Sequence, residues 1–397
     1  MGDLILRNDN KIIFLILDGL GDIPDPAHSL KTPLENAKKP NIDRLAMERG
    51  VLGRTIPVGI GVTPGSGPGH LSLFGYDPLR CEIGRGILEA LGLDMDLEPS
   101  DVAARGNFCT VKDGIVADRR AGRIDTSVGK RLVESLSQAV PSVEGVRVLI
   151  KAGVSHRFAI VFRGEGLSDA LGDADPHREG KPFGWAAPQT TGAERTARVV
   201  NAFIKKAMDV LKEEPAANGV LLRGFSKRPD IPRFPEKYRM DALAITTYPM
   251  YRGIAKVLGM SVEKVPVDYK EMVAILKEYY GRYQFFFLHV KETDVAGEDG
   301  NFKEKTRAIE FVDRIIPDIY ALKPKVLVVA GDHSTPCPLK GHSWHPVPLL
   351  IVADTGETDG LSFNEKKCLK GSIGAIYAKE LMTLAMAYGL KLDKYGA

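Results

Sequence analysis

The stretch VLVVAGDHSTPCPLKGHSWHPVP, residues 326–348, decides the fold class of this 397-residue chain. Five apolar residues run directly into Gly-Asp-His, a pattern typical of a strand that is buried on both faces and ends at a polar site. Asp332 and His333 are adjacent, and His342 and His345 follow in the same segment. An Asp-His pair at a strand end with another histidine nearby favours a metal site over a structural histidine. We prefer His342 to His345 as the second imidazole ligand, because His345 precedes a proline at the entrance of the next strand and could instead contact substrate.

Three other apolar runs predict strands of the same sheet, at residues 12–17, 285–290 and 349–352, and we expect all four strands to be parallel neighbours. Asp18 directly follows the first run, and Asp294 lies after the second in a segment crowded with acidic residues. Ligands of an open parallel sheet bind beyond the carboxyl ends of its strands, so these side chains should converge. A turn aspartate and a solvated acidic loop remain the alternatives for Asp18 and Asp294.

Two segments predict helices that cover this sheet. Residues 41–48 read NIDRLAME, with Asn41 as the helix cap, and residues 303–316 have apolar residues at helical spacing and should end at Pro317.

The glycine- and proline-rich segment GVTPGSGPGHLSLFGYDP, residues 61–78, places Ser66 just before an apolar helix-like stretch at residues 70–74. A serine beside a helix N-terminus is near N–H groups that favour phosphate oxygens. A bound metal would activate its hydroxyl by stabilising the alkoxide, so Ser66 is a candidate nucleophile without a His-Asp relay. An ordinary helix-capping serine is the alternative.

Composition limits the remaining possibilities. The formal net charge is only +3, without a basic stripe, which argues against nucleic acid as a partner, and no apolar run is long enough to span a membrane. The four cysteines form no CxxC pair, which fits a reducing cytoplasm.

Residues 98–239 have shorter segments with more arginine and glycine, and we interpret them as a smaller α+β domain inserted between residues 1–97 and 240–397 of the sheet domain.

The order of these candidates gives the chain a family resemblance. With Asp18, Ser66, Asp294, Asp332, His333 and His342 in sequence, it resembles the alkaline phosphatase superfamily, and most closely the archaeal-type cofactor-independent (2,3-bisphosphoglycerate-independent) phosphoglycerate mutases. The resemblance rests on motifs in both proposed domains: LDGLGD, TPLENAKKPNIDRLA, TPGSGPGHLSLFGYDP, ARGNFCT, DRRAGRI, DADPH, GDHSTP and GHSWHPVP. It implies an α/β fold with a largely parallel, alkaline-phosphatase-like sheet sandwiched by helices, and an inserted substrate-binding domain.

The resemblance also implies two divalent metal ions, with manganese as the first choice and magnesium, cobalt or zinc as alternatives. Asp18, Ser66, Asp332 and His333 would surround one ion, and Asp294 and His342 would contribute to the other. Glu298 stands where the family pattern has a histidine, so it becomes a candidate ligand that favours harder ions.

The implied reaction interconverts 3-phosphoglycerate and 2-phosphoglycerate, in glycolysis and gluconeogenesis, through a phosphoserine on Ser66. The inserted domain should exclude water and supply arginines for the anionic substrate. The candidates are Arg105, Arg119, Arg120, Arg123, Arg223 and Arg228, with Asp175 and His177 for proton transfer. A small phosphoglycerate is the expected partner, and the oligomeric state is open. A metal-dependent phosphomonoesterase is the alternative function, and a binding protein that has lost activity is a further one.

Overall fold

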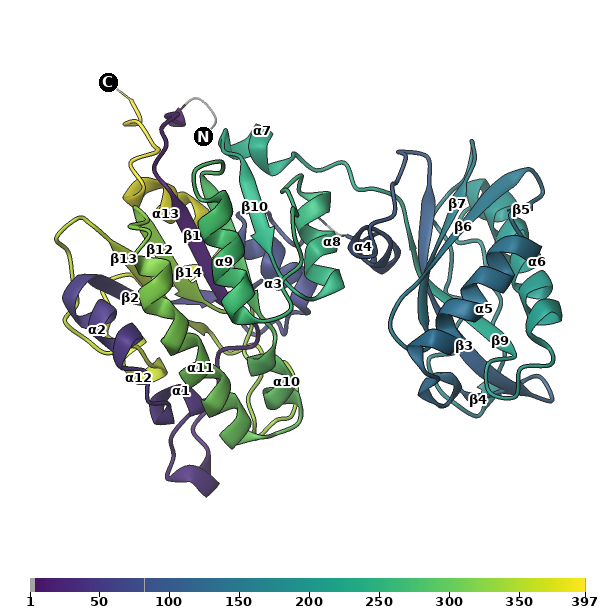
Figure 1. Cartoon of the computed structure of the whole chain (residues 1–397), viewed down its shortest axis with the longest axis horizontal. Coiled ribbons are helices and arrows are strands. Elements are labelled where there is room, and N and C mark those ends of the chain that lie inside the picture. Colours follow the sequence, from purple (N-terminus) through teal and green to yellow (C-terminus); the bar gives the residue numbers. More distant parts are fainter. Residues whose placement is uncertain (1–3, 82, 397) are drawn as a thin grey trace. The chain divides into compact units, whose positions relative to one another are not determined.

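The computed structural model describes residues 4–81 and 83–396. The chain divides into two compact units, shown in Figure 1: unit 1 comprises residues 1–82, 231–248 and 254–397, and unit 2 comprises residues 83–230 and 249–253. The sequence pattern placed the divisions at residues 98 and 239 instead. Unit 2 begins earlier because helix α4 (Arg85–Gly92) belongs to it, and the Ile87 N–H donates a hydrogen bond to the Ser226 hydroxyl of that unit.

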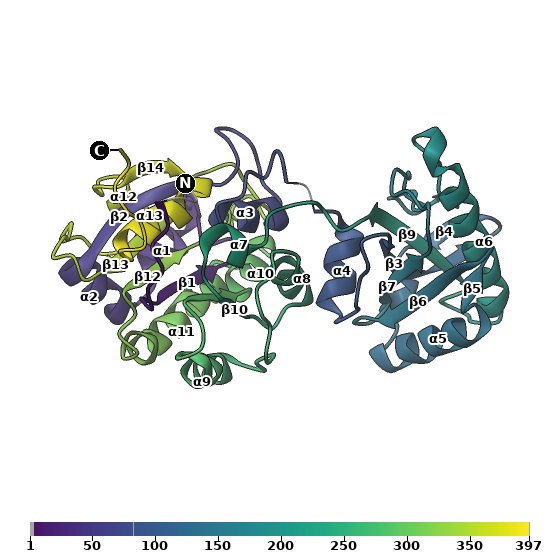
Figure 2. The ribbon, with the colours of Figure 1, turned by 90° about the horizontal axis from the view of Figure 1, so that it is seen from above.

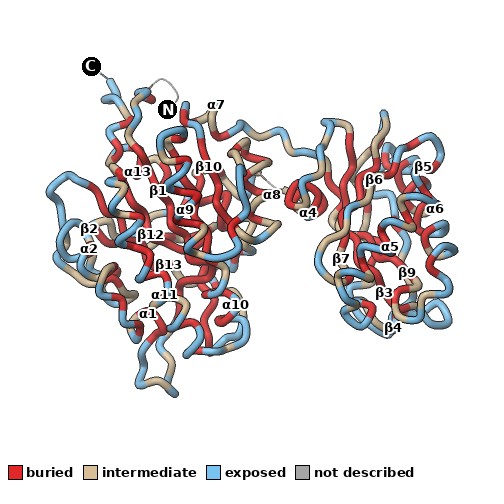
Figure 3. Tube along the Cα trace, viewed as in Figure 1, coloured by how far each residue is buried: buried red, intermediate tan, exposed pale blue. Residues whose placement is uncertain are grey.

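Unit 1 is built on a seven-stranded sheet with the strand order β10-β11-β1-β12-β13-β2-β14. The strands in this order are Ala242–Ile245, Phe285–Val290, Ile12–Leu17, Val326–Ala330, Val347–Ala353, Gly50–Ile56 and Gly374–Tyr377. The predicted strands at residues 12–17, 285–290 and 326–330 are confirmed, and all three are buried along their whole length. Figure 3 shows this burial for β1 and β12. These three strands and β10 are parallel to one another.

The prediction that the fourth run is a parallel neighbour was wrong, because β13 is antiparallel to β12 and to β2. Parallel neighbours need a long crossover, usually a helix, that returns the chain to the starting edge of the sheet. The connection between β12 and β13 has no named helix or strand, and an isolated bridge joins Ser334 to Ser343 within it. The chain therefore stays at the carboxyl edge of β12 and re-enters the sheet from that side.

Helices cover both faces of this sheet. In Figure 2, α9 (Tyr269–Tyr279) and α11 (Phe302–Tyr320) lie on one face, and α3 (Ser66–Leu73) and α13 (Leu381–Tyr388) lie on the other. Ile13 and Leu15 of β1 belong to the same core cluster as Leu276 of α9 and Ile309 of α11.

Both helix predictions for unit 1 need a correction at one end. Helix α2 (Pro40–Arg49) begins one residue before Asn41, and α11 continues through Pro317 to Tyr320. One residue accounts for both differences. The Asp313 carboxylate accepts hydrogen bonds from the Ile42 and Asn41 N–H groups, at 2.7 and 3.3 Å, and so caps α2. The Asp313 carbonyl, which Pro317 cannot satisfy, accepts a hydrogen bond from Asn41 Nδ2 at 3.2 Å.

The remaining helices are short. Their bounds are α1 Pro33–Asn36, α7 Phe234–Tyr238, α8 Pro249–Val257, α10 Glu292–Glu298 and α12 Glu365–Cys368. None of the helices in residues 4–81 and 83–396 is long and apolar enough to cross a membrane. All four cysteines are free thiols.

Unit 2 contains a second, mainly antiparallel sheet with the order β5-β6-β7-β3-β4-β8, and β9 pairs with β3. The strands are β3 Val102–Lys112, β4 Ile115–Asp118, β5 Ser142–Val143, β6 Val146–Ala152, β7 Arg157–Arg163, β8 Lys181–Pro182 and β9 Gly219–Ser226. One face packs against α5 (Thr126–Ala139) and α6 (Glu194–Leu211), in a core that includes Phe108, Phe162 and Phe203. The opposite face carries polar side chains, which are described below.

Candidate active site

The candidate metal residues of unit 1 gather at the carboxyl edge of three parallel strands. Asp18 follows β1, Asp294 lies in α10 just after β11, and Asp332 and His333 follow β12. Ser66 is the first residue of α3, so its hydroxyl lies at a helix N-terminus. Strand ends that adjoin in the sheet explain why residues so distant in sequence meet here.

One group of side chains surrounds His333, and it is buried except at the serine. His333 Nε2 lies 3.3 Å from Asp18 Oδ1, 3.3 Å from Asp332 Oδ2 and 3.3 Å from Ser66 Oγ. The Gly19 N–H donates a hydrogen bond to Asp332 Oδ1 at 3.1 Å. Donor atoms of Asp18, Asp332 and His333 all lie within 4.8 Å of one another, which is close enough to share one ion.

A second group joins Asp294, His333 and His342, whose donor atoms also lie within 4.8 Å of one another. The imidazole rings of His333 and His342 stack, with their centroids 3.7 Å apart. His342 Nε2 lies 3.5 Å from Asp294 Oδ1 and 3.8 Å from Glu298 Oε1. Glu298 is 55% exposed and falls in neither group, so it lies at the rim of the second group.

The charges at this edge are strongly coupled. Burial alone would raise the pKa of Asp18, but hydrogen bonds from His289 and His333 and the charge of Lys291 hold it well below its usual range. Burial opposes protonation of His333, but the neighbouring Asp332 and Asp18 raise its pKa to about 9. His289 is wholly buried, and this burial lowers its pKa to about 4.

These residues fit a divalent cation. Asp18 Oδ1 and Asp332 Oδ2 are buried and lie close to imidazole nitrogens, with His333 Nε2 at 3.3 Å from each and His70 Nδ1 at 3.0 Å from Asp332 Oδ2. Two buried carboxylates that share one proton-bearing imidazole leave negative charge that a cation would neutralise. Carboxylate oxygens with imidazole nitrogens suit manganese, zinc or magnesium.

Four residues of the site were missed in the sequence. His70 Nδ1 lies 3.0 Å from Asp332 Oδ2, and His289 Nε2 lies 3.0 Å from Asp18 Oδ2. Lys291 Nζ reaches both Asp18 Oδ2, at 3.3 Å, and Asp294 Oδ2, at 2.5 Å.

Local signals for these residues did exist. His289 is the only titratable residue in the run FFFLHV, and His70 stands four residues after Ser66, on the same face of α3. Thr335, the fourth, gives no such signal, although its hydroxyl donates to Asp294 Oδ1 at 2.6 Å and lies 3.0 Å from His333 Nδ1.

His345, the alternative to His342, lies outside both groups. Its Nδ1 makes a hydrogen bond with Ser343 Oγ at 3.0 Å, and its ring stacks on Trp344. His342 Nδ1, by contrast, lies 3.0 Å from the Pro64 carbonyl, which orients Nε2 of that ring toward Asp294.

Two of the candidate arginines of unit 2 lie with a third arginine, Arg157, on the face of its sheet that carries polar side chains. Arg105 on β3 lies opposite Arg223 on β9, and Asn107, on the same face of β3, lies opposite Arg157 on β7. The Nε atoms of all three arginines are buried, and none has a hydrogen-bond partner among residues 4–81 and 83–396. Burial, despite the nearby Glu89, lowers the pKa of Arg105 to about 10, and Arg157 and Arg223 add to this effect. The face therefore concentrates positive charge that can accept an anion.

Arg119 is held by a neighbouring carboxylate. It donates from Nε to Asp175 Oδ1 at 3.0 Å and from a terminal nitrogen to Asp175 Oδ2 at 2.6 Å. Burial would raise the pKa of Asp175, but this pair and the His177 N–H keep it low. The His177 side chain is 56% exposed and lies 3.2 Å from Asp173. Arg120, Arg123 and Arg228 are exposed.

Two solved structures share this fold over nearly the whole chain. A protein from Pyrococcus horikoshii is 31% identical, with a TM-score of 0.82, and covers 98% of this chain and 100% of its own. The cofactor-independent phosphoglycerate mutase from Thermoplasma acidophilum is 33% identical, with a TM-score of 0.74, and covers 96% of this chain and 100% of its own. The class defined by fold and site is thus an α/β enzyme similar to the cofactor-independent mutases.

Sequence relatives make the assignment specific. Residues 48–217 match the profile of the 2,3-bisphosphoglycerate-independent phosphoglycerate mutases. Relatives from Thermotoga neapolitana and Thermus thermophilus, both named "Probable 2,3-bisphosphoglycerate-independent phosphoglycerate mutase", are 52% and 48% identical, over 99% and 100% of this chain and 98% of each relative. The chain therefore belongs to the 2,3-bisphosphoglycerate-independent phosphoglycerate mutase family and is an isomerase.

Proposed function

We propose that the chain interconverts 3-phosphoglycerate and 2-phosphoglycerate, in the cytoplasm, through a phosphoserine formed on Ser66 and with two bound divalent metal ions. One observation carries this proposal: Ser66 Oγ lies at the start of α3, 3.3 Å from His333, beside the buried carboxylates of Asp18 and Asp332. A nucleophile with charge-rich neighbours at a helix N-terminus suits attack on a phosphate ester.

The reaction needs two transfers that reverse each other. Ser66 Oγ attacks the phosphorus of 3-phosphoglycerate, the bond from phosphorus to the C3 oxygen breaks, and the serine proton passes to that oxygen. Glycerate stays bound until its 2-hydroxyl attacks the phosphoserine, loses its proton and restores the Ser66 hydroxyl. His333 already carries a proton, so the acceptor for the hydroxyl proton at the end of β12 is the Asp332 carboxylate, 3.3 Å from that imidazole.

Two sets of residues would hold the ions. Asp18, Ser66, Asp332 and His333 would bind one, and Asp294, His342 and Glu298 would bind the other. When bound, the ions would neutralise phosphate oxygens and lower the pKa of the serine hydroxyl. Thr335 orients two of these ligands, because its hydroxyl contacts both Asp294 and His333.

The arginines of unit 2 would bind the substrate's carboxylate and phosphate. Arg105 and Arg223 are the best supported, since their buried Nε groups have no hydrogen-bond partner in the described chain. The bidentate pair with Asp175 keeps the Arg119 guanidinium in one orientation. Asp175 is ionised by this pairing, so His177, which is exposed, is the better candidate for moving a proton. Arg120, Arg123 and Arg228 would act at the surface.

One experiment separates this function from the phosphomonoesterase alternative. The purified chain, loaded with manganese, is incubated with 3-phosphoglycerate while 2-phosphoglycerate and free phosphate are measured in the same sample. We expect 2-phosphoglycerate to dominate and Ser66→Ala to abolish its formation. A product mixture dominated by free phosphate would contradict the mutase proposal.

A further inference from the structure

A cavity of about 560 Å³ lies in unit 1 beside the carboxyl end of β11, between residues 247–248 and helices α9, α10 and α11. Its apolar lining includes Tyr248, Tyr269, Val295, Ala308 and Phe311. The Tyr269 and Phe311 rings lie 5.1 Å apart, and Tyr248, Val295 and Phe311 are 38%, 47% and 37% exposed. Exposed apolar side chains gathered around a cavity of this size are typical of a ligand site.

The cationic side chains around the cavity form ion pairs, whereas two of its carboxylates form none with the described residues. Both cations are already paired: Lys291 binds Asp18 and Asp294, and Arg307 forms an ion pair with Glu304. Glu292 and Asp299 also line the cavity, and within residues 4–81 and 83–396 neither carboxylate forms an ion pair. The charge left uncompensated at the cavity wall is therefore negative.

We propose that this cavity binds an organic cation, namely an ammonium or amidinium group attached to an apolar ring or chain. Aromatic faces attract cations, and the two unpaired carboxylates add a direct attraction. The apolar part of the ligand would cover Val295 and Phe311, which are otherwise exposed to water. The cavity shares Lys291 with the candidate active site, whereas Ser66 and the proposed metal ligands do not line it.

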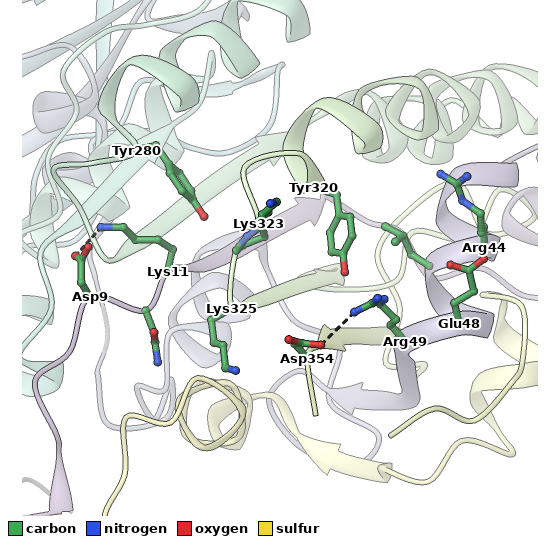
Figure 4. Close-up of a pocket in the computed structure, with 13 residues that line it drawn as sticks. Asp9, Lys11, Arg44, Glu48, Arg49, Tyr280, Tyr320, Lys323, Lys325 and Asp354 are labelled. Atoms are coloured by element: carbon green, nitrogen blue, oxygen red, sulfur yellow. Dashed lines mark hydrogen bonds and ion pairs between the residues drawn. The ribbon is translucent and has the colours of Figure 1, made fainter. Parts of the chain in front are cut away.

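A larger cavity lies at the opposite edge of the sheet, and its charged side chains are balanced by partners within the fold. Its volume is about 610 Å³, and Figure 4 shows Lys11 paired with Asp9 and Arg49 paired with Asp354. Helices α2, α9 and α11 all end near this cavity, so its cations also balance the negative ends of the helix dipoles. Its charges are thereby accounted for within the fold.

The test compares three probes of similar size and different charge: benzamidinium, benzyl alcohol and benzoate. Each is titrated into the full chain labelled at valine and alanine methyl groups, and the Val295 and Ala308 resonances are followed by NMR. We expect benzamidinium to shift these resonances and to bind at least fivefold more tightly than benzyl alcohol, and benzoate to bind more weakly than both. Equal affinities for benzamidinium and benzoate, or no shift at these two methyls, would overturn the proposal.

Two variants locate the site and separate charge from shape. Ala308→Phe fills the cavity and should weaken benzamidinium binding at least tenfold, whereas Val210→Phe, on an exposed helix position of unit 2, should not change it. Asp299→Asn keeps the shape of the cavity. It should weaken benzamidinium binding at least threefold without changing the affinity for benzyl alcohol, and Glu213→Gln, on the surface of unit 2, is the matched control. If Asp299→Asn changed neither affinity, the proposed role of the charge would be wrong, even if Ala308→Phe failed to fold.

Discussion

Lys305 should hold together the two loops that carry the candidate metal ligands. Its ammonium is fully buried and donates hydrogen bonds to Asp22 Oδ2 at 2.8 Å, to the Gly21 carbonyl at 3.2 Å and to the Thr335 carbonyl at 2.8 Å. The first two acceptors follow β1 and the third follows β12. Lys305→Met therefore leaves the buried Asp22 carboxylate without its cation and frees the backbone of Thr335.

The expected cost is about 3–5 kcal/mol of unfolding free energy, the usual range when one partner of a buried ion pair is removed. A matched surface pair serves as the control. Lys277 and Asp318 lie 2.7 Å apart but are 47% and 57% exposed, so Lys277→Met should cost less than about 1 kcal/mol.

Each unit contains one tryptophan, Trp185 in unit 2 and Trp344 in unit 1, which allows the units to be followed separately. In a Trp185→Phe background, urea unfolding monitored by Trp344 fluorescence reports on unit 1. Adding Asp22→Asn to Lys305→Met should recover at least half of the loss, because the unpaired buried charge is then gone. A cost of Lys305→Met below about 1 kcal/mol, or no recovery in the double variant, would refute this reasoning.

Three further predictions concern other parts of the molecule. Burial raises the pKa of Glu365 from 4.5 to about 7, so the folded chain keeps a proton that the unfolded chain has lost. Stability should therefore fall by about 3 kcal/mol as pH rises through this window, and thermal unfolding of Glu365→Gln should lack this fall. Thr335→Val should weaken manganese binding about 10- to 100-fold in calorimetry, since two ligands lose their orienting hydroxyl, and unchanged affinity would contradict this. Arg119→Lys should lower the stability of unit 2 by about 1–3 kcal/mol in Trp185 fluorescence with Trp344→Phe, because lysine cannot form the bidentate pair with Asp175; an unchanged midpoint would argue against it.

Strand-end residues were the part of the site most accessible from sequence. Asp18, Asp332 and His333 follow apolar runs. In a strand that is buried on both faces, the change from apolar to polar residues marks the end of the strand in the sequence. His289 was missed because it lies inside an apolar run and not after it. Its position there does not show which end of the strand its side chain faces.

Strand direction and helix ends depended on contacts that local patterns do not contain. The run at residues 349–352 is equally apolar in either direction, although the His-Pro segment before it, rather than after it, hinted that the chain enters from the site edge. Helix α11 passes Pro317 because Asn41, 272 residues away, takes the freed carbonyl of Asp313. Long-range partners of this kind explain why the fold class was predictable while these details were not.

The central claim is that Ser66 carries the phosphoryl group between the two hydroxyls of glycerate. The most direct test is rapid acid quench of the manganese-loaded chain during turnover of 3-phosphoglycerate labelled with ³²P, followed by peptide mapping of the label. The account predicts label on Ser66 at early times and no label in Ser66→Ala. When the labelled substrate is used up and replaced by unlabelled phosphoglycerate, the label on Ser66 should disappear. Formation of 2-phosphoglycerate by Ser66→Ala, or stable label on any other residue, would contradict it.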